Sequence, residues 1–372
     1  MADLSSPFLA ALTDREAAAR AHKARGGKVV GYLTNTSPTE LIVAAGAFPL
    51  QLAAGAIHTP LADRYMEDLF DPIVRAVFEG MLAGRYDFVD AVILPRTSDS
   101  VQRLYYYLCE IRRMGEAKVP EPLLFDLLHT PWYSSAEYNF SRITELKAGL
   151  ERVTGTPVTD AALTSAIAAA NARRVAMRSL VALRREGRVT GVQANRVFAA
   201  KGAMAGPDFD AALAAVLAAP GPVSEAPRVV IAGSPLDTCA LHSLVEAAGG
   251  LVVGDFHEFG EPMIGPEVEA GPDPLRALMA HYHRDVASSR TFPQSPKPLV
   301  DFAKACGASG VIFNFYAEEE ALTWEYPAQR RALEAEGIAT LCFEGQPHRP
   351  NPLLFAQPLA NFVRKLTITV AP

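Results

Sequence analysis

The sequence predicts an α/β protein with two parallel β-sheets, each covered by helices, and a helical segment between them. Two stretches of the chain alternate short apolar, β-rich runs with segments of helical periodicity, which is the pattern of parallel strands joined by crossover helices. The stretch between them shows helical periodicity alone. The 372 residues also exceed one typical core. We therefore predict an N-terminal α/β domain over residues 1–133, a helical segment over 134–222 and a C-terminal α/β domain over 223–372.

The best-defined unit is a strand followed by a loop and a helix at residues 28–46. An apolar, β-rich run ends just before Thr34. Ser37 and Glu40 stand at the spacing of a capping box, with a proline between them at the first helical position, so a helix is expected to begin there. Gly46 is suited to end that helix in the left-handed conformation. The loop at Thr34 thus lies at the carboxyl end of a strand, where open α/β sheets bind ligands.

The remaining elements follow from the same two periodicities. An amphipathic helix is expected before the first strand, and the proline- and glycine-rich residues 218–227 have the composition of a linker. The two alternating stretches are typical of doubly wound, Rossmann or flavodoxin-like domains. Strands are expected at 28–33, 49–52, 88–95, 122–127, 228–232, 251–254, 310–315 and 337–343, and helices at 63–82, 100–114, 134–152, 159–185, 193–204, 208–217, 238–248, 298–306 and 358–365.

Composition excludes several classes of function. The formal net charge is −6 and no basic stripe is present, so nucleic acid is not an expected partner. No apolar run reaches the roughly 20 residues of a membrane span, and the N-terminal stretch lacks the uninterrupted apolar core of a signal peptide, so we expect a cytoplasmic protein. The four cysteines form no CxxC pair, and buried free thiols are the favoured interpretation for Cys109, Cys239, Cys306 and Cys342.

Several segments together resemble one known family. GYLTNTSPTELIVAAGAFPLQL in the first unit is similar to the N-terminal signature of the subunits of 2-hydroxyacyl-CoA dehydratases and benzoyl-CoA reductases, of the 2-hydroxyglutaryl-CoA dehydratase D-component type. The residues at 86–105, 146–174, 228–256 and 310–345 resemble further segments of the same family. Their order and spacing extend the resemblance over nearly the whole chain and imply the two-domain α/β fold described above.

The resemblance implies an iron–sulfur chemistry whose ligands this chain lacks. In the family, three cysteines hold a [4Fe-4S] cluster beside an acyl-CoA thioester, and an ATP-dependent activator supplies the electron. The corresponding positions here are Thr34, Ser98, which precedes Asp99, and Glu319. Hydroxyl groups are poor iron–sulfur ligands. We therefore predict no cofactor in this chain and a [4Fe-4S] cluster in a partner subunit.

Two hypotheses of function follow. In the first, the chain forms a heterodimer with a homologous, cysteine-containing subunit and supports its acyl-CoA site, with an ATP-dependent activator as a further partner. In the second, the chain stands alone and binds a small molecule in the vacated cluster pocket through Thr34, Ser98, Asp99 and Glu319. A third, least favoured hypothesis is a redox-independent lyase with Glu319 as the general base.

Two further residues are candidates for substrate binding. Ser234 lies in a Gly–Ser–Pro turn that opens a helix and could cradle a phosphate, although a tight turn without that role is the safer interpretation. His257 stands near a position where the family carries a further cysteine. With the acidic run at 318–320 it could hold a divalent cation, but a solvated helix start explains that run better. No metal site is predicted.

Overall fold

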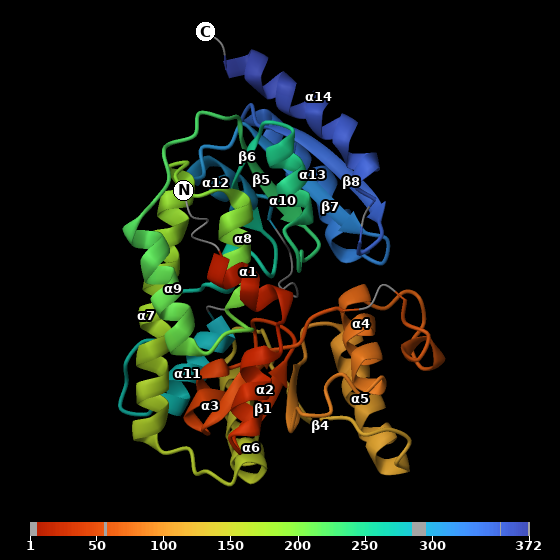
Figure 1. Cartoon of the computed structure of the whole chain (residues 1–372), viewed down its shortest axis with the longest axis vertical. Coiled ribbons are helices and arrows are strands. Elements are labelled where there is room, and N and C mark those ends of the chain that lie inside the picture. The colour runs from red at the N-terminus through yellow and green to blue at the C-terminus, as the bar shows by residue number, and fades with distance from the viewer. Residues whose placement is uncertain (1–5, 56–57, 285–294, 350, 371–372) are drawn as a thin grey trace.

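Both predicted parallel sheets are present in the computed structural model, which describes residues 6–55, 58–284, 295–349 and 351–370. The strand order is β2-β1-β3-β4 in the first sheet and β6-β5-β7-β8 in the second, and every pair of neighbours is parallel. Figure 1 shows the two sheets in separate halves of the molecule. The strands are β1 (Lys28–Tyr32), β2 (Ala47–Gln51), β3 (Ala91–Pro95), β4 (Glu121–Phe125), β5 (Arg228–Gly233), β6 (Leu251–Phe256), β7 (Gly310–Tyr316) and β8 (Ala339–Gln346).

Helices cover both faces of each sheet, and a further helical group runs along one side of the molecule beside both halves (Figure 1). Short 3₁₀ turns occur at η1 (Ala62–Arg64) and η2 (Glu261–Met263). The helices are α1 (Ser6–Thr13), α2 (Ala17–Ala24), α3 (Thr39–Ala44), α4 (Pro72–Leu82), α5 (Asp99–Met114), α6 (Tyr133–Thr154), α7 (Asp160–Arg185), α8 (Gly191–Ala200), α9 (Gly206–Ala218), α10 (Ala240–Ala247), α11 (Pro274–Arg284), α12 (Lys297–Ala305), α13 (Ala321–Ala335) and α14 (Pro352–Val370).

Each sheet has one point at which the chain reverses its direction of winding. From β1 the chain moves outward to β2, and it then returns to place β3 on the other side of β1. The second sheet repeats this arrangement with β5, β6 and β7. In doubly wound folds, ligands bind beyond the carboxyl ends of the two strands that flank such a reversal. Thr34 and Ser98 follow one flanking pair, and Ser234 and Glu319 follow the other.

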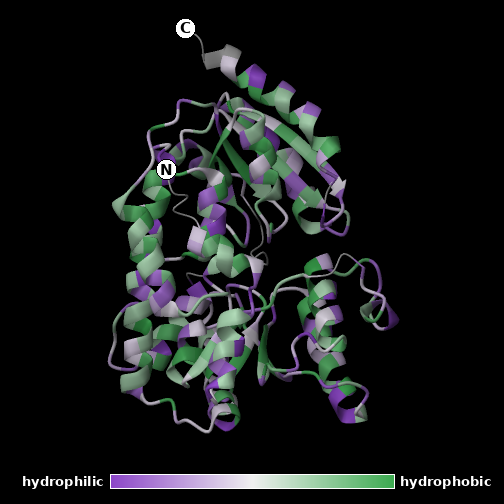
Figure 2. Cartoon of the chain, in the orientation of Figure 1, coloured by the Kyte–Doolittle hydropathy of each residue, from purple (hydrophilic) through white to green (hydrophobic). Residues whose placement is uncertain are grey.

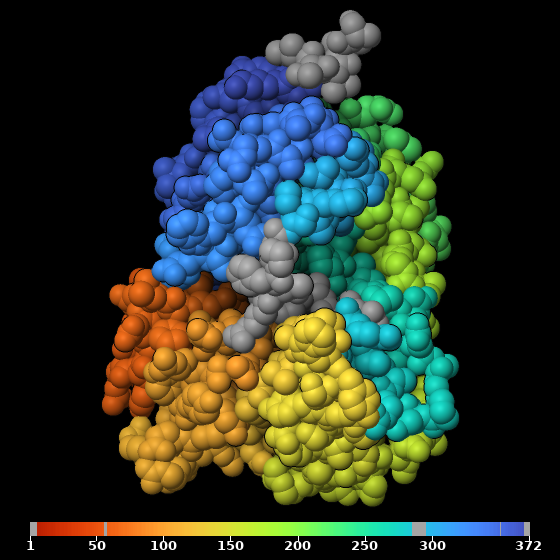
Figure 3. Space-filling model, turned by 180° about the vertical axis from the view of Figure 1, so that it is seen from behind, coloured from red at the N-terminus to blue at the C-terminus, as the bar shows by residue number. Residues whose placement is uncertain are grey.

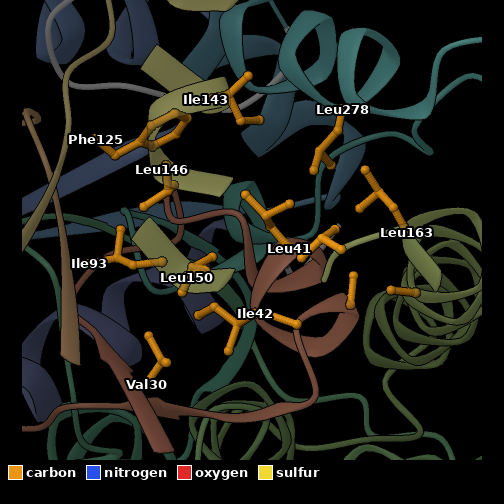
Figure 4. Packing of buried hydrophobic residues seen from close by; sticks show 14 of the residues in the cluster. Val30, Leu41, Ile42, Ile93, Phe125, Ile143, Leu146, Leu150, Leu163 and Leu278 are labelled. Carbon is orange, nitrogen blue, oxygen red and sulfur yellow. The ribbon is translucent and has the colours of Figure 1, made fainter. Parts of the chain in front are cut away.

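The core of the first domain lies on both faces of its sheet because successive side chains of a strand point to opposite sides. Val30 and Ile93 pack on one face against α3, α6, α7 and α11, as Figure 4 shows at close range. Val29 and Val92 pack on the other face with side chains of α4 and α5. Strands buried on both faces in this way appear as continuous apolar runs, in agreement with the sequence pattern.

The second domain is built in the same way, and α7 joins the two halves. Val230 and Val311 pack with α12 and α13 on one face, while Val229 and Ile312 pack with α10 and α14 on the other. The strands accordingly stand out as apolar segments in Figure 2. Helix α7 contacts α3 in the first half and β6 in the second. The turns of α7 from Ala176 to Leu183 pack with α1, α8 and α9 into a separate helical core.

A late segment of the chain returns to the first half of the molecule. Helix α11 follows β6 in sequence, yet it packs against α6 and α7. Leu278 and Tyr282 of α11 belong to the apolar core of the first sheet. Figure 3 shows α11 in cyan beside α6 in yellow. This helix is not among those predicted from the sequence.

The predicted capping box at Ser37 is wrong. Helix α3 begins at Thr39, its N-cap position is Pro38, and no side chain caps it. The Ser37 hydroxyl has no hydrogen-bond partner among the described residues. Glu40 instead binds a cation of α7, Arg174, at 2.5 Å. A buried charge-assisted pair is stronger than a bond from a backbone N–H, so the tertiary contact prevails. Gly46 does end the helix with φ of 74°.

The single helix predicted over 63–82 is also wrong. Only a 3₁₀ turn forms at its start, and α4 begins at Pro72. The Asp71 carboxylate accepts hydrogen bonds from the backbone N–H groups of Ile73 at 2.7 Å and Val74 at 3.1 Å, which caps the helix. The Asp-Pro pair was the correct signal, because proline favours the first helical turn.

Both ends of the chain also differ from the prediction. Two short helices, α1 and α2, replace the single N-terminal helix, and residues 1–5 lie outside the described residues. Helix α14 begins at Pro352 instead of residue 358. Phe355 in its first turns is fully buried and packs against Phe343 of β8, with ring centroids 4.2 Å apart and the rings tilted by 33°. This packing compensates for the proline that lies inside the helix.

Candidate functional site at the domain junction

The carboxyl ends of the two sheets meet at a contact that we call the domain junction, formed by Asn35, Ala54, Asp71, Glu258 and Tyr316. The side-chain amide of Asn35, after β1, donates to the backbone carbonyl of Glu258, after β6, at 3.2 Å. Ala54 and Tyr316 belong to one small apolar cluster that spans the two domains. The two reversal points of the fold therefore face one another, and ligands of two-domain α/β proteins commonly bind in such a place.

Thr34 lies at this junction but its hydroxyl is already engaged. The residue is 8% exposed. Its Oγ1 lies 2.7 Å from Oγ1 of Thr36 in the same loop, so the two hydroxyls share a hydrogen bond. A hydroxyl in this arrangement can accept one further bond from a ligand.

Ser98 caps the helix that follows β3. Its Oγ accepts a hydrogen bond from the backbone N–H of Val101 at 3.3 Å, and α5 begins at the next residue. Asp99, a predicted binding residue, is the first residue of α5 and is exposed. Its carboxylate in the first turn still lies favourably near the helix N-terminus. The neighbouring Ser100 hydroxyl accepts a bond from the backbone N–H of Asp71 at 3.0 Å, which ties this loop to the domain junction.

Ser234 belongs to the framework of the second sheet. Its Oγ accepts from the backbone N–H of Tyr316 at 3.0 Å, and its own N–H donates to the carbonyl of Asn314 at 2.9 Å. Gly233 before it has φ of 113°, and a Cβ there would lie 2.3 Å from the Asn314 oxygen. Only glycine fits this close approach between β5 and β7. Because Ser234 is 1% exposed and fully engaged, the turn has a structural role.

His257 is buried and its two ring nitrogens have no hydrogen-bond partner among the described residues. Burial lowers the pKa of the ring to about 4, although Asp255 opposes that effect. The imidazole is thus neutral at physiological pH. A neutral buried ring with unpaired nitrogens is an unusual feature in a folded protein and indicates a group available to a ligand or a water molecule.

Asp71, Glu258 and Glu319 form an acidic group at the junction, of which only Glu319 was predicted from the sequence. Burial raises the pKa of all three carboxyls, and Asp71 raises that of the other two further. The pKa of Glu258 reaches about 7. Glu319 accepts a hydrogen bond from the backbone N–H of Leu322 at 3.0 Å, at the start of α13. In the sequence, the Asp–Pro cap signature could have indicated Asp71, and the histidine–glutamate pair at 257–258 could have indicated Glu258.

A buried ion network supports the loop that carries His257 and Glu258. The guanidinium of Arg184, at the end of α7, is fully buried and lies 2.9 Å from Asp255 of β6. The other carboxylate oxygen of Asp255 lies 2.8 Å from Nε2 of His242. Arg184 and His242 together hold the pKa of Asp255 far below its usual range, against the effect of burial. This network was not predicted from the sequence, because its members lie 71 and 13 residues apart.

The residues at the three positions where the resemblance predicts cluster ligands do not fit a [4Fe-4S] cluster. Thr34 and Ser98 offer neutral hydroxyls that are already hydrogen-bonded, and Glu319 offers a hard carboxylate, whereas such clusters require thiolates. The cysteines lie on separate elements, and Cys306 is fully buried after α12. In the part of the chain that the structure describes, no three histidine, cysteine, aspartate or glutamate residues are grouped as a metal site.

Two doubly wound domains that meet at their reversal points define a two-domain α/β protein of the kind that binds ligands between its domains. The chain belongs to the family described as 2-hydroxyglutaryl-CoA dehydratase, D-component, whose model matches residues 34–351. No helix among the described residues is long and apolar enough to cross a membrane.

The chain is also similar to several named proteins. It is 25% identical over 304 residues to one of the subunits of benzoyl-CoA reductase from Thauera aromatica, an alignment that covers 77% of each chain. It is 23% identical to the (R)-phenyllactyl-CoA dehydratase beta subunit of Clostridium sporogenes, over 86% of each chain. It is 25% identical to the beta subunit of lactoyl-CoA dehydratase from Anaerotignum propionicum, over 87% of this chain and 88% of that protein.

Proposed function

We propose that this chain is a subunit of a 2-hydroxyacyl-CoA dehydratase or benzoyl-CoA reductase-type complex, that it holds no iron–sulfur cluster of its own, and that it supports the acyl-CoA site of a cysteine-containing homologous partner. The donor groups at the three ligand positions carry this proposal. Thr34 and Ser98 use their hydroxyls to order the loops after β1 and β3, and Glu319 orders the start of α13.

The relatives support the assignment to a complex. Each of them is named as a subunit, and two are named as beta subunits, so each is one part of a larger assembly. In the proposed heterodimer, the partner holds the cluster and the ATP-dependent activator supplies the electron. This chain contributes a folded α/β surface and no redox group.

The first experiment measures iron, acid-labile sulfide and the visible spectrum of the chain purified without oxygen. We expect the chain expressed without its partner to be colourless, and the chain in its native cell to co-purify with a cysteine-containing homologous subunit. If the chain expressed alone is brown, with about four irons per molecule, the proposal is overturned, because this chain would then hold one [4Fe-4S] cluster. Failure to recover any such subunit would contradict the heterodimer.

A variant with cysteines at the three predicted ligand positions provides a second test. Changing Thr34, Ser98 and Glu319 together to cysteine restores three thiolates at the family positions, and we expect this variant to take up iron and sulfide on reconstitution. The matched control carries Thr36→Cys in place of Thr34→Cys, together with the same changes at 98 and 319. Equal iron uptake by both triple variants would show that the ligand positions are misassigned.

An alternative function is favoured by unpaired polar atoms at the domain junction. Among the described residues, the Oδ1 atom of Asn35, the Oε1 atom of Glu258 and the Oε2 atom of Glu318 are buried without a hydrogen-bond partner. Such atoms suit a stand-alone protein that binds a small polar molecule between its domains. Calorimetric titration with acyl-CoAs and with their free acids tests this hypothesis, which the absence of any binding heat would contradict.

Glu319 would act as a general base only if the chain itself has lyase activity. Its raised pKa, caused by burial and by Asp71, is the feature that supports such a role. Unchanged turnover of an acyl-CoA by the Glu319→Gln variant would exclude it.

A further inference from the structure

A polar pocket lies beside the domain junction and shares only Asn35 with it. Its empty volume is about 480 Å³, including the solvent at its mouth. The first domain contributes the ends of β1 and β2, and the second contributes the turn at Pro262, Met263 and Ile264. Helices α7 and α11 close the remaining sides. The pocket is lined by none of the site residues predicted from the sequence, which are Thr34, Ser98, Asp99, Ser234, His257 and Glu319.

Lys201 is half-buried and lines the pocket. It follows α8 directly, and its neighbour Gly202 accepts a backbone hydrogen bond from Gln51 at 2.8 Å, which fixes the segment against β2. A Cβ at position 202 would lie 2.3 Å from that of Gln51, so the close contact between this segment and β2 requires glycine. Among the described residues, the Lys201 ammonium forms no hydrogen bond or ion pair. Burial, and then Arg174, lower its pKa to about 8, although Glu40 opposes this shift.

The other charges around the pocket are already balanced. Arg174 of α7 lies 2.5 Å from the Glu40 carboxylate of α3. Tyr282 of α11 donates to the second oxygen of Glu40 at 2.9 Å. The neighbouring Arg173 is paired with Asp210 at 2.7 Å. His281 of α11 lies 3.4 Å from Arg174 through Nε2. The pocket therefore has one positive charge in excess.

Two hydroxyl donors accompany this charge. The Ser37 hydroxyl is buried and has no partner among the described residues. The Tyr32 hydroxyl, at the end of β1, likewise makes no hydrogen bond within the described part of the chain. Pro262, Met263 and Ile264, which also line the pocket, are apolar. A pocket that combines a half-buried cation, two hydroxyl donors and apolar residues suits an anion with a short hydrocarbon tail.

We propose that this pocket binds a small organic carboxylate, with the Lys201 ammonium as its counter-ion, the Tyr32 and Ser37 hydroxyls as further donors, and the hydrocarbon tail against Pro262 and Ile264. A monocarboxylate matches the single excess charge. A dianion such as phosphate would exceed it and would lie near Glu40. Because both domains line the pocket, the bound acid would also strengthen their contact.

Binding is tested with acetate, butanoate and inorganic phosphate at pH 7, by calorimetry and by the shift of the melting temperature. We expect butanoate to bind more tightly than acetate, because its longer chain buries more apolar surface, and to raise the melting temperature. Lys201→Met should weaken butanoate binding by roughly tenfold or more. The control, Lys297→Met, removes a surface lysine that pairs with Asp301 on α12 and should bind as the unaltered chain does.

Three outcomes would overturn the proposal. These are the absence of butanoate binding, binding of phosphate in preference to both carboxylates, and equal affinity in Lys201→Met and Lys297→Met. If Lys201→Met does not fold, labelling of the unaltered chain decides the question. An amine-reactive reagent should modify Lys201 near pH 8, mass spectrometry should locate the label, and butanoate should protect this lysine but not Lys297. Unchanged labelling in butanoate would contradict the site.

The pH dependence provides a further readout. Because the pKa of Lys201 is about 8, its charge is lost as the pH rises through that value. The affinity for butanoate should therefore fall between pH 7 and pH 9, and a constant affinity would contradict an ammonium counter-ion. The pocket neither requires nor excludes a cluster-bearing partner, so this test and that of the proposed function can fail independently.

Discussion

The fold raises the pKa of the Glu258 carboxyl, and the effect of this shift on stability can be measured. One of its carboxylate oxygens is buried without a partner among the described residues, and the group lies near Asp71. Both effects disfavour the charged form. The carboxyl has a pKa of about 7 in the folded chain, against 4.5 as its ordinary value.

We predict that Glu258→Gln removes a pH-dependent loss of stability. The folded carboxyl holds its proton up to about pH 7, whereas the unfolded one releases it near pH 4.5. Between these values the native state binds more protons, so the free energy of unfolding decreases as the pH rises. The variant should be more stable than the unaltered chain by about 1–3 kcal/mol at pH 8 and nearly equal to it at pH 4.5. Urea denaturation at the two pH values measures the difference.

The control for this prediction is Glu225→Gln, which changes an exposed carboxylate in the linker. It should show no such dependence on pH. If Glu258→Gln differs from the unaltered chain by the same amount at both pH values, the raised pKa is wrong.

At the scale of single elements, two helix starts show how local signals succeed or fail. Thr190 caps α8 in a complete capping box, in which its side chain accepts from the backbone N–H of Gln193 and the Gln193 side chain accepts from the N–H of Thr190. Ser37 and Glu40 have the same spacing, yet they form no such box at α3. The difference is that Glu40 forms a buried pair with Arg174, whereas the Gln193 side chain accepts the hydrogen bond from the N–H of Thr190.

We predict that Thr190→Ala destabilises the protein by about 1 kcal/mol, because a backbone N–H at the start of α8 loses its acceptor. Ser37→Ala removes a hydroxyl with the same sequence context but no capping bond, so its free energy of unfolding should stay within about 0.5 kcal/mol of that of the unaltered chain. Chemical denaturation of both variants makes the comparison. A loss at Ser37→Ala as large as at Thr190→Ala would show that Ser37 does cap α3.

At the scale of the whole molecule, α7 couples the two halves. Leu163 and Ile167 near its start lie in the core of the first sheet. Leu180 lies in the helical core, and Arg184 at its end is buried against the second sheet. One rigid helix thus contributes to three cores, and the loss of its packing at one end should weaken contacts at the other.

We predict that Leu163→Ala lowers the stability of both sheets together, by about 2–5 kcal/mol, because it leaves a cavity at a fully packed site. Hydrogen exchange at the backbone amides of β3 and β7 reports on each sheet separately. The matched control is Val175→Ala on the same helix, where the side chain is 49% exposed, and it should change neither sheet. A loss confined to β3 would show that the halves unfold independently.

The sequence by itself determined the class of fold, the number of parallel strands and most of their positions. The inner strands β1, β3, β5 and β7 are buried on both faces, so a short apolar run identifies each of them without knowledge of its neighbours. The sequence also placed Thr34, Ser98, Ser234 and Glu319 at the carboxyl ends of strands, which is where the structure has them. The family resemblance rests on the same local segments and agrees with the family match over residues 34–351.

Only the tertiary structure decided which polar groups meet. Glu40 pairs with Arg174, which lies 134 residues away in the sequence. Asn35 forms a hydrogen bond with Glu258, 223 residues away, and Tyr282 forms one with Glu40, 242 residues away. No periodicity encodes such pairs, because each depends on how separate elements are packed together. The unpaired ammonium of Lys201 is the same kind of result. The sequence shows a lysine at this position. The lack of a partner for it among the described residues follows from packing alone, and so does its place between two domains.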